Sequence, residues 1–188
     1  MQQSSSKFKQ TNAFAMQYGI ALGMWGILSM VIMALSLKVT SISLLSSIIT
    51  FCSPLIAYIL TVMFRKNVAL PNEGFSFGRA FLFTFVMGFY ASVWIALFVF
   101  IYLSYIDNGY IFNAYESLLS NQDYAGSLQQ SGIIESVNAS NISEMIDIMR
   151  DIPPANYAAS IIYMSVLANP VISLVIAAIC QRKPSFTD

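Results

Sequence analysis

Apolar residues fill four long stretches of the chain, and charged residues are confined to the segments between them. Four intervals contain no charged residue and hold 28, 26, 27 and 30 residues: Lys9 to Lys38, Lys38 to Arg65, Arg79 to Asp107, and Asp151 to Arg182. About 20 apolar residues in a helix, each rising about 1.5 Å, cross the roughly 30 Å hydrocarbon core of a bilayer. Each interval therefore predicts one membrane-spanning helix.

The apolar character is continuous within these stretches and does not alternate, which favours helices over the strands of a membrane barrel. The predicted spans are Ala13–Leu37, Ile42–Phe64, Ala80–Ile106 and Tyr157–Cys180. The polar residues 1–10 predict a short disordered tail. The expected fold is therefore all-α: a four-helix transmembrane bundle, with residues 1–188 forming a single integral membrane domain.

The segment 107–156, between the third and fourth spans, is the one large region outside the predicted spans. Apolar residues recur in it at helical spacing in two groups: Ile111, Phe112, Tyr115, Leu118 and Leu119, then Ile142, Met145, Ile146, Met149 and Ile152. The segment has seven acidic residues and one basic residue. Helices that lie on anionic lipid usually have basic polar faces. We therefore predict a helical extracytoplasmic loop that packs on the outer mouth of the bundle.

Basic residues are distributed unevenly between the two sides of this topology. One side has Lys38 and Arg150, and the other has Lys7, Lys9, Arg65, Lys66, Arg79, Arg182 and Lys183. Lys and Arg accumulate in cytoplasmic segments of membrane proteins. Both termini are therefore predicted to be cytoplasmic.

The composition agrees with a membrane protein: 57% of the residues are hydrophobic and 10% are charged. Soluble domains carry about 25% charged residues, which cover their surface. The lipid bilayer is thus the first expected partner, and we expect no nucleic-acid partner.

The chain lacks the residues that several types of catalysis and transport require. The chain has no histidine, so Ser-His and Cys-His pairs and the commonest metal ligand are missing. The predicted spans contain no ionisable acidic or basic residue, which argues against ion-driven transporters and proton pumps. Neither Cys52 nor Cys180 has the basic neighbours that activate a thiolate. We predict no catalytic residue, metal ligand or cofactor site, and we do not expect an enzyme.

Prolines interrupt two of the predicted spans, and each follows a polar residue. Pro170 follows Asn169 and removes a helical donor, which frees the carbonyl of Val166 and bends the helix. Pro54 follows Ser53 in the second span. Two interpretations stay open: helix kinks in which Asn169 bonds a neighbouring helix, or a polar pocket that the two kinked helices share.

Small residues recur every four positions along the first and third spans. The first stripe holds Ala15, Gly19 and Gly23, and the third span has Gly88, Ser92 and Ala96. Such stripes let helix backbones approach closely in lipid. Either these two spans pack on each other, or Gly19 and Gly23 form a homodimer face.

Glu144, Asp147 and Asp151 lie at positions i, i+3 and i+7, on one face of the second helix predicted in the segment 107–156. The spacing does not match the loops that hold calcium. This face is either simply solvated or a contact surface for a partner protein.

Three motifs carry a family resemblance. They are "GFSFGRAF" at 74–81 leading into the third span, the helical segment before the fourth span, and "ANP" at 168–170 followed by "QRK" at 181–183. With them the chain resembles domain of unknown function 4199, a bacterial family of small four-helix inner-membrane proteins. The resemblance implies a multi-pass protein of the bacterial inner (cytoplasmic) membrane. It implies no activity and carries over no catalytic residue.

The leading functional hypothesis is a non-enzymatic accessory or assembly protein, because the acidic helical loop is suited to meeting a partner. The alternative is a small transporter or lipid-handling protein, with a polar pocket between the second and fourth spans formed by Ser53, Pro54, Asn169 and Pro170.

Overall fold

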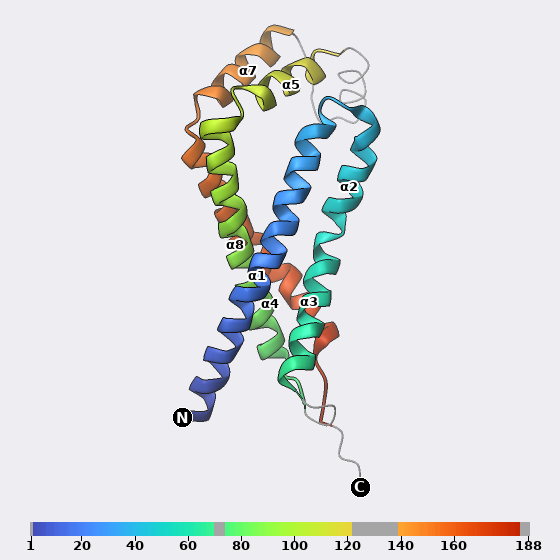
Figure 1. Cartoon of the computed structure of the whole chain (residues 1–188), viewed down its shortest axis with the longest axis vertical. Helices are drawn as coiled ribbons and strands as arrows, with labels where there is room; N and C mark the ends of the chain where they lie inside the picture. The colour runs from blue at the N-terminus through green and yellow to red at the C-terminus, as the bar shows by residue number, and fades with distance from the viewer. Residues whose placement is uncertain (1, 70–73, 122–138, 185–188) are drawn as a thin grey trace.

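A computed structural model describes residues 2–69, 74–121 and 139–184, and within them nearly all of the chain is helical (Figure 1). The elements in chain order are α1 (Gln2–Ser36), the short 3-10 helix η1 (Thr40–Ile42), α2 (Ser43–Phe51), α3 (Ser53–Val68), α4 (Phe77–Ile101), the π-helix η2 (Tyr102–Ile106), α5 (Tyr110–Leu119), α7 (Ala139–Asp151) and α8 (Pro154–Cys180).

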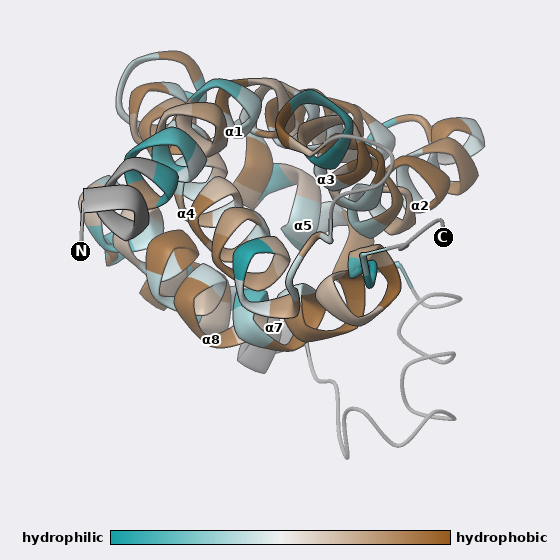
Figure 2. Ribbon diagram, turned by 90° about the horizontal axis from the view of Figure 1, so that it is seen from below, coloured by the Kyte–Doolittle hydropathy of each residue, from teal (hydrophilic) through white to brown (hydrophobic). Residues whose placement is uncertain are grey.

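Within the described residues, four helical stretches are long and apolar enough to cross a membrane: Lys7–Ser36, Ser43–Val68, Phe77–Ile106 and Pro154–Cys180. Large apolar side chains on them point outward; Leu44, Phe51 and Leu167 are 74%, 85% and 72% exposed. Much of each spanning helix is coloured as hydrophobic in Figure 2, and the exposed apolar side chains occupy a surface where a soluble protein would carry polar ones. The predicted all-α bundle of four spans is confirmed, and it indicates a multi-pass membrane protein.

Both termini lie at one end of the bundle, called here the terminal end (Figure 1). The helices α5 and α7 lie together across the opposite end, called here the α5/α7 end. The helix α4 is central, because α1 and α8 both pack along it. The helices α2 and α3 return alongside α1.

The second span is two helices rather than the one that the sequence predicts. The helix α2 ends at Phe51 and α3 begins at Ser53, which places Pro54 in the first turn of a new helix. Proline is tolerated there because its missing N–H would have no partner within the helix. In contrast, α8 continues without a break through Pro170.

The prediction of a disordered tail over residues 1–10 is wrong, because α1 begins at Gln2. Contacts with α4 support this first part of the helix. The Arg79 guanidinium donates to Gln10 Oε1 at 2.7 Å and to Thr11 Oγ1 at 3.4 Å. Thr11 is almost fully buried.

An aromatic cluster fills the core of the terminal end. The rings of Phe64 and Phe83 stack with centroids 4.0 Å apart, and Phe75 and Phe14 pack on Phe64 at 5.8 and 5.6 Å. The Arg79 guanidinium covers the Phe64 ring at 5.5 Å. A hydrogen bond between Thr61 Oγ1 and Thr84 Oγ1 (3.0 Å) joins α3 to α4 beside this cluster.

Two of the motifs that carry the family resemblance meet at the terminal end. Phe75 of "GFSFGRAF" and Arg182 of "QRK" form an antiparallel bridge, with N–H to O=C distances of 2.8 and 2.9 Å. Arg65 Nη1 also donates to the carbonyl of Cys180 at 2.9 Å, which satisfies an orphan carbonyl at the end of α8. The two motifs therefore join the start of α4 to the end of α8.

Candidate functional site

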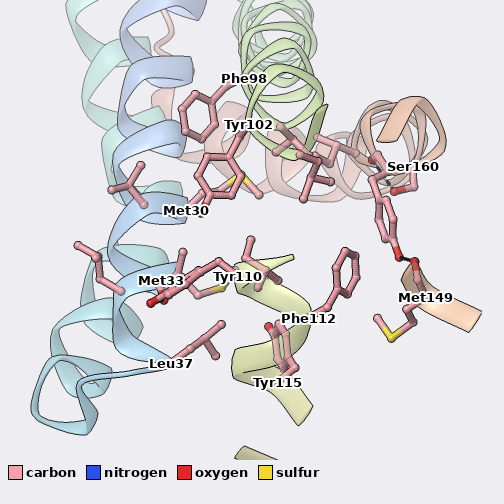
Figure 3. Close-up of a pocket in the computed structure, with 18 residues that line it drawn as sticks. Met30, Met33, Leu37, Phe98, Tyr102, Tyr110, Phe112, Tyr115, Met149 and Ser160 are labelled. Carbon is pink, nitrogen blue, oxygen red and sulfur yellow. Dashed lines mark hydrogen bonds between the residues drawn. The ribbon is translucent and has the colours of Figure 1, made fainter. Parts of the chain in front are cut away.

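A cavity of about 400 Å³, called here the end cavity, lies inside the bundle at the α5/α7 end. Side chains from α1, α4, η2, α5, α7 and α8 line it, and nearly all of them are apolar or aromatic (Figure 3). The labelled lining residues are Met30, Met33, Leu37, Phe98, Tyr102, Tyr110, Phe112, Tyr115, Met149 and Ser160.

A tight reversal after η2 turns the chain from α4 into α5 at the edge of the cavity. Asn108 and Gly109 adopt positive φ angles of 45° and 79°, a region that asparagine and glycine tolerate best. The buried Asp107 carboxylate accepts a hydrogen bond from the Ile111 N–H at 3.1 Å, which caps α5. This geometry directs Tyr110 from α5 toward α1, where its hydroxyl lies 3.5 Å from the Ala34 carbonyl oxygen.

Polar contacts hold α5 and α7 over the cavity. Arg150 on α7 donates to Glu116 Oε2 at 2.8 Å and to Asn113 Oδ1 at 2.6 Å on α5, and to Asp147 Oδ1 at 3.1 Å on its own helix. The Tyr157 hydroxyl of α8 donates to the Met149 carbonyl at 2.7 Å. The two helices thus form a cover joined to the spans by few contacts.

The polar residue Ser160 in the lining has its hydroxyl bonded within its own helix, to the Tyr157 carbonyl at 2.8 Å. Among the residues that the structure describes, the lining carries no charged side chain. Such a surface suits the burial of an apolar molecule, because a polar ligand would lose hydrogen bonds to water without replacing them.

A second cavity, of about 420 Å³, lies near the middle of the spans between α1, α3, α4 and α8 and is called here the mid-span cavity. Ser53, Pro54 and Asn169 all line it, as in the pocket interpretation of the sequence. Pro170 is not part of the lining. The Asn169 amide donates to Ser165 Oγ at 2.6 Å on its own helix. Asn169 therefore lies at the cavity wall with a local hydrogen bond.

The mid-span cavity also contains a polar group that the sequence did not single out. The Trp25 indole lines it, and its Nε1 is buried without a hydrogen-bond partner among the described residues. Ile161 lines both this cavity and the end cavity, so the two spaces are neighbours along the inner face of α8.

The predicted small-residue stripes lie at helix contacts within this one chain. A Cβ on Gly19 would lie 2.6 Å from Tyr90 Cβ, and one on Gly23 would lie 2.9 Å from Trp94 Cβ, both on α4. A Cβ on Gly88 would meet the Asn169 amide at 2.6 Å. Packing of the first span on the third is thus observed, and the homodimer through Gly19 and Gly23 stays a prediction.

Of the predicted acidic face on α7, Glu144, Asp147 and Asp151 are all exposed. Asp147 pairs with Arg150 inside the chain. Within residues 2–69, 74–121 and 139–184, no group of three or more His, Cys, Asp or Glu side chains is placed to hold a metal ion.

The sequence reasoning missed the end cavity, although part of its lining shows a pattern. Phe98 and Tyr102 are four residues apart, as are Met30 and Ala34. This spacing puts each pair on one helix face. In a membrane helix, however, the same apolar spacing occurs whether the helix face contacts lipid, protein or a cavity. The spacing therefore did not identify this site.

A family model described as "Protein of unknown function (DUF4199)" matches residues 17–182 of the chain. Neither the curated proteins nor the solved structures contain a match.

Proposed function

The chain belongs to the DUF4199 family, and from its cavities we propose that it is a lipid-binding membrane protein whose end cavity holds the apolar chain of a lipid. The observation that carries the proposal is the end cavity itself, which is about 400 Å³ and almost wholly apolar. Pockets for small ligands are typically about 300–1,000 Å³ and mostly apolar.

The surroundings of the cavity also support a lipid as the ligand. Its lining includes Met30 and Met33 near the end of one span and Tyr102 near the end of another. Lipid chains occupy this depth of a bilayer, so the ligand is at high local concentration. Methionine side chains are flexible and adapt to ligands of irregular shape.

Filling the cavity tests the proposal. Ala34→Phe places a large ring in the cavity from α1, whereas Ala21→Phe adds the same ring to an exposed position of the same helix that does not line the cavity. Native mass spectrometry of the protein released from lipid nanodiscs counts the bound lipids. The wild type and Ala21→Phe should retain a lipid, and Ala34→Phe should lose it.

A second variant keeps the test decisive if Ala34→Phe fails to fold. Val99→Phe fills the same cavity from α4, where Val99 is buried at the cavity wall. Equal lipid retention by the wild type and by a folded cavity-filling variant would exclude the end cavity as the lipid site.

The mid-span cavity is the pocket that the sequence suggested for lipid handling. Asn169→Leu removes its amide while keeping a similar side-chain volume. If this pocket contributes to lipid movement, the variant should lose lipid exchange between vesicles while expression and thermal stability stay unchanged. Loss of stability alone would make Asn169 a packing residue.

The accessory or assembly role is the second candidate, and one surface favours it. Met145 and Ile148 on α7, with Ile152 directly after it, form an exposed apolar stripe with 46%, 61% and 36% exposure, beside Glu144 and Asp151. Exposed apolar stripes beside charged residues are typical of protein contact sites. A photo-crosslinker at Ile148 should capture one defined partner in native membranes, and Glu144→Lys with Asp151→Lys should abolish that capture. Capture that is unchanged by this charge reversal would argue against the acidic face.

We also propose a bacterial inner membrane as the location, with both termini cytoplasmic. The orientation is supported by the excess of Lys and Arg at the terminal end of the bundle, and the bacterial membrane is what the family resemblance implies. A reporter that works only in the cytoplasm should be active when fused to the C-terminus. Activity of a periplasm-specific reporter at that position would reverse the proposed orientation.

A further inference from the structure

We propose that the bound lipid carries an anionic phosphate headgroup and that Lys38 binds this headgroup beside the end cavity. The inference rests on the proposed function, because the same lipid would place its apolar chain in the end cavity.

A cleft of about 340 Å³, called here the Lys38 cleft, adjoins the end cavity. Its lining is Leu37, Lys38, Tyr110, Asn113, Ala114 and Ser117. Leu37 and Tyr110 also line the end cavity. One molecule with a polar head and an apolar tail can therefore occupy both spaces across these two side chains.

The Lys38 cleft offers mainly hydrogen-bond donors. The Lys38 ammonium lies 4.8 Å from the centre of the Tyr110 ring, and it has three donors and no acceptor. Asn113 Oδ1 already accepts from Arg150, and the amide nitrogen of Asn113 is a hydrogen-bond donor. The Ser117 hydroxyl adds a further donor. A cluster of donors around one cation suits the oxygens of a phosphate.

The charged residues around Lys38 favour Lys38 as the cation that binds an anionic ligand. Among the described residues, no carboxylate lies within salt-bridge distance of its ammonium. Arg150 is the other basic residue of this end, and it is paired with Glu116 and Asp147. The Asp107 carboxylate accepts the Ile111 N–H. Glu116, Asp147 and Asp107 thus each accept a hydrogen bond from within the chain.

The depth of Lys38 also fits a lipid headgroup. Lys38 follows the first span, which ends at Ser36, by two residues. Headgroups lie at this boundary, directly outside the hydrocarbon core. A dissolved phosphate ion would use the Lys38 cleft but would have no need of the adjoining end cavity, so a lipid accounts for both spaces.

Lipid competition tests the headgroup. The full-length protein is placed in nanodiscs of equal parts phosphatidylglycerol and phosphatidylcholine, and native mass spectrometry identifies the lipid that it keeps. The wild type should prefer phosphatidylglycerol. Lys38→Gln should reduce that preference about fivefold, since one lysine near the membrane surface contributes about 1 kcal/mol to binding an anionic lipid. Lys183→Gln, at the terminal end, is the matched control and should leave the preference unchanged.

The outcomes separate this inference from the proposed function. If Lys38→Gln and the wild type both keep one lipid without headgroup preference, the assignment of an anionic headgroup is wrong and the lipid cavity stands. If the wild type keeps no lipid, both are wrong. If inorganic phosphate binds wild type and Ala34→Phe equally well and depends on Lys38, the cleft binds a dissolved anion, which overturns the lipid assignment.

Discussion

The two ends of this bundle are built differently, although the same four spans run through both. At the terminal end, Phe64, Phe75 and Phe83 are at most 1% exposed, and Phe75 and Phe83 both pack on Phe64. At the α5/α7 end, the described residues line the end cavity, and a few polar contacts around Arg150 join the covering helices.

This difference indicates that the two ends contribute differently to the stability of the fold and to ligand binding. Dense packing stabilises helix association in lipid, because no hydrophobic driving force acts between helices there. A region with fewer packed contacts opens more readily and admits ligands. We infer that the terminal end maintains the fold and that the α5/α7 end is available for binding.

The largest expected difference between the ends is in the response to removing an aromatic ring. Phe64→Ala should lower the free energy of unfolding by about 3 kcal/mol or more, because it leaves a void in a filled core. Phe98→Ala, which enlarges the end cavity, should lower it by clearly less. Unfolding in mixed micelles measures both, and equal losses would refute the contrast between the ends.

A methyl group at the contact of α1 with α4 should have the next largest effect. Gly19→Ala should destabilise by about 1–3 kcal/mol, because its Cβ would overlap Tyr90. Gly78→Ala is the control, since a Cβ there meets nothing within 4 Å. It should be neutral or slightly stabilising. If Gly19→Ala is equally neutral but changes the oligomeric state, the stripe serves a dimer instead.

The buried hydroxyl pair at the terminal end should have a smaller effect. Thr61→Val removes the hydrogen bond to Thr84 between α3 and α4 and should cost about 1 kcal/mol. Thr50→Val is the control, since Thr50 Oγ1 bonds only the Ser46 carbonyl of its own helix. Thermal unfolding distinguishes them, and a loss as large for Thr50→Val would mean that the Thr61–Thr84 bond adds nothing.

The smallest effect is expected at the α5/α7 cover. Arg150→Gln should lower stability by no more than about 1 kcal/mol, because its ion pairs are partly exposed. The loss should shrink further at high salt. A double-mutant cycle with Glu116→Gln isolates the pair, and a coupling well above this value would show that the cover is held as firmly as the terminal end.

The spans themselves could be read from the sequence, because twenty or more uncharged apolar residues have no other stable place than a bilayer. The helices α5 and α7 were also predictable from their amphipathic spacing. So were the close approaches at Gly19 and Gly23, since small residues at every fourth position have a direct geometric meaning.

The break at Cys52 and the Phe75–Arg182 bridge were not predictable in this way. Proline at position 54 fits either a kinked helix or the first turn of a new one, and only its neighbours determine which forms. The bridge joins residues more than one hundred positions apart, and its hydrogen bonds are between backbone atoms that carry no side-chain signature.

The candidate site depends most on the three-dimensional arrangement. A cavity is the volume that packed side chains leave unfilled, so it has no residue pattern of its own. Met30, Phe98 and Tyr110 lie on three separate helices and come together only because α5 turns back over the bundle. The chain's apolar pattern thus specifies a four-span membrane protein. The packing of those spans determines where side chains fill the interior and where they leave a cavity.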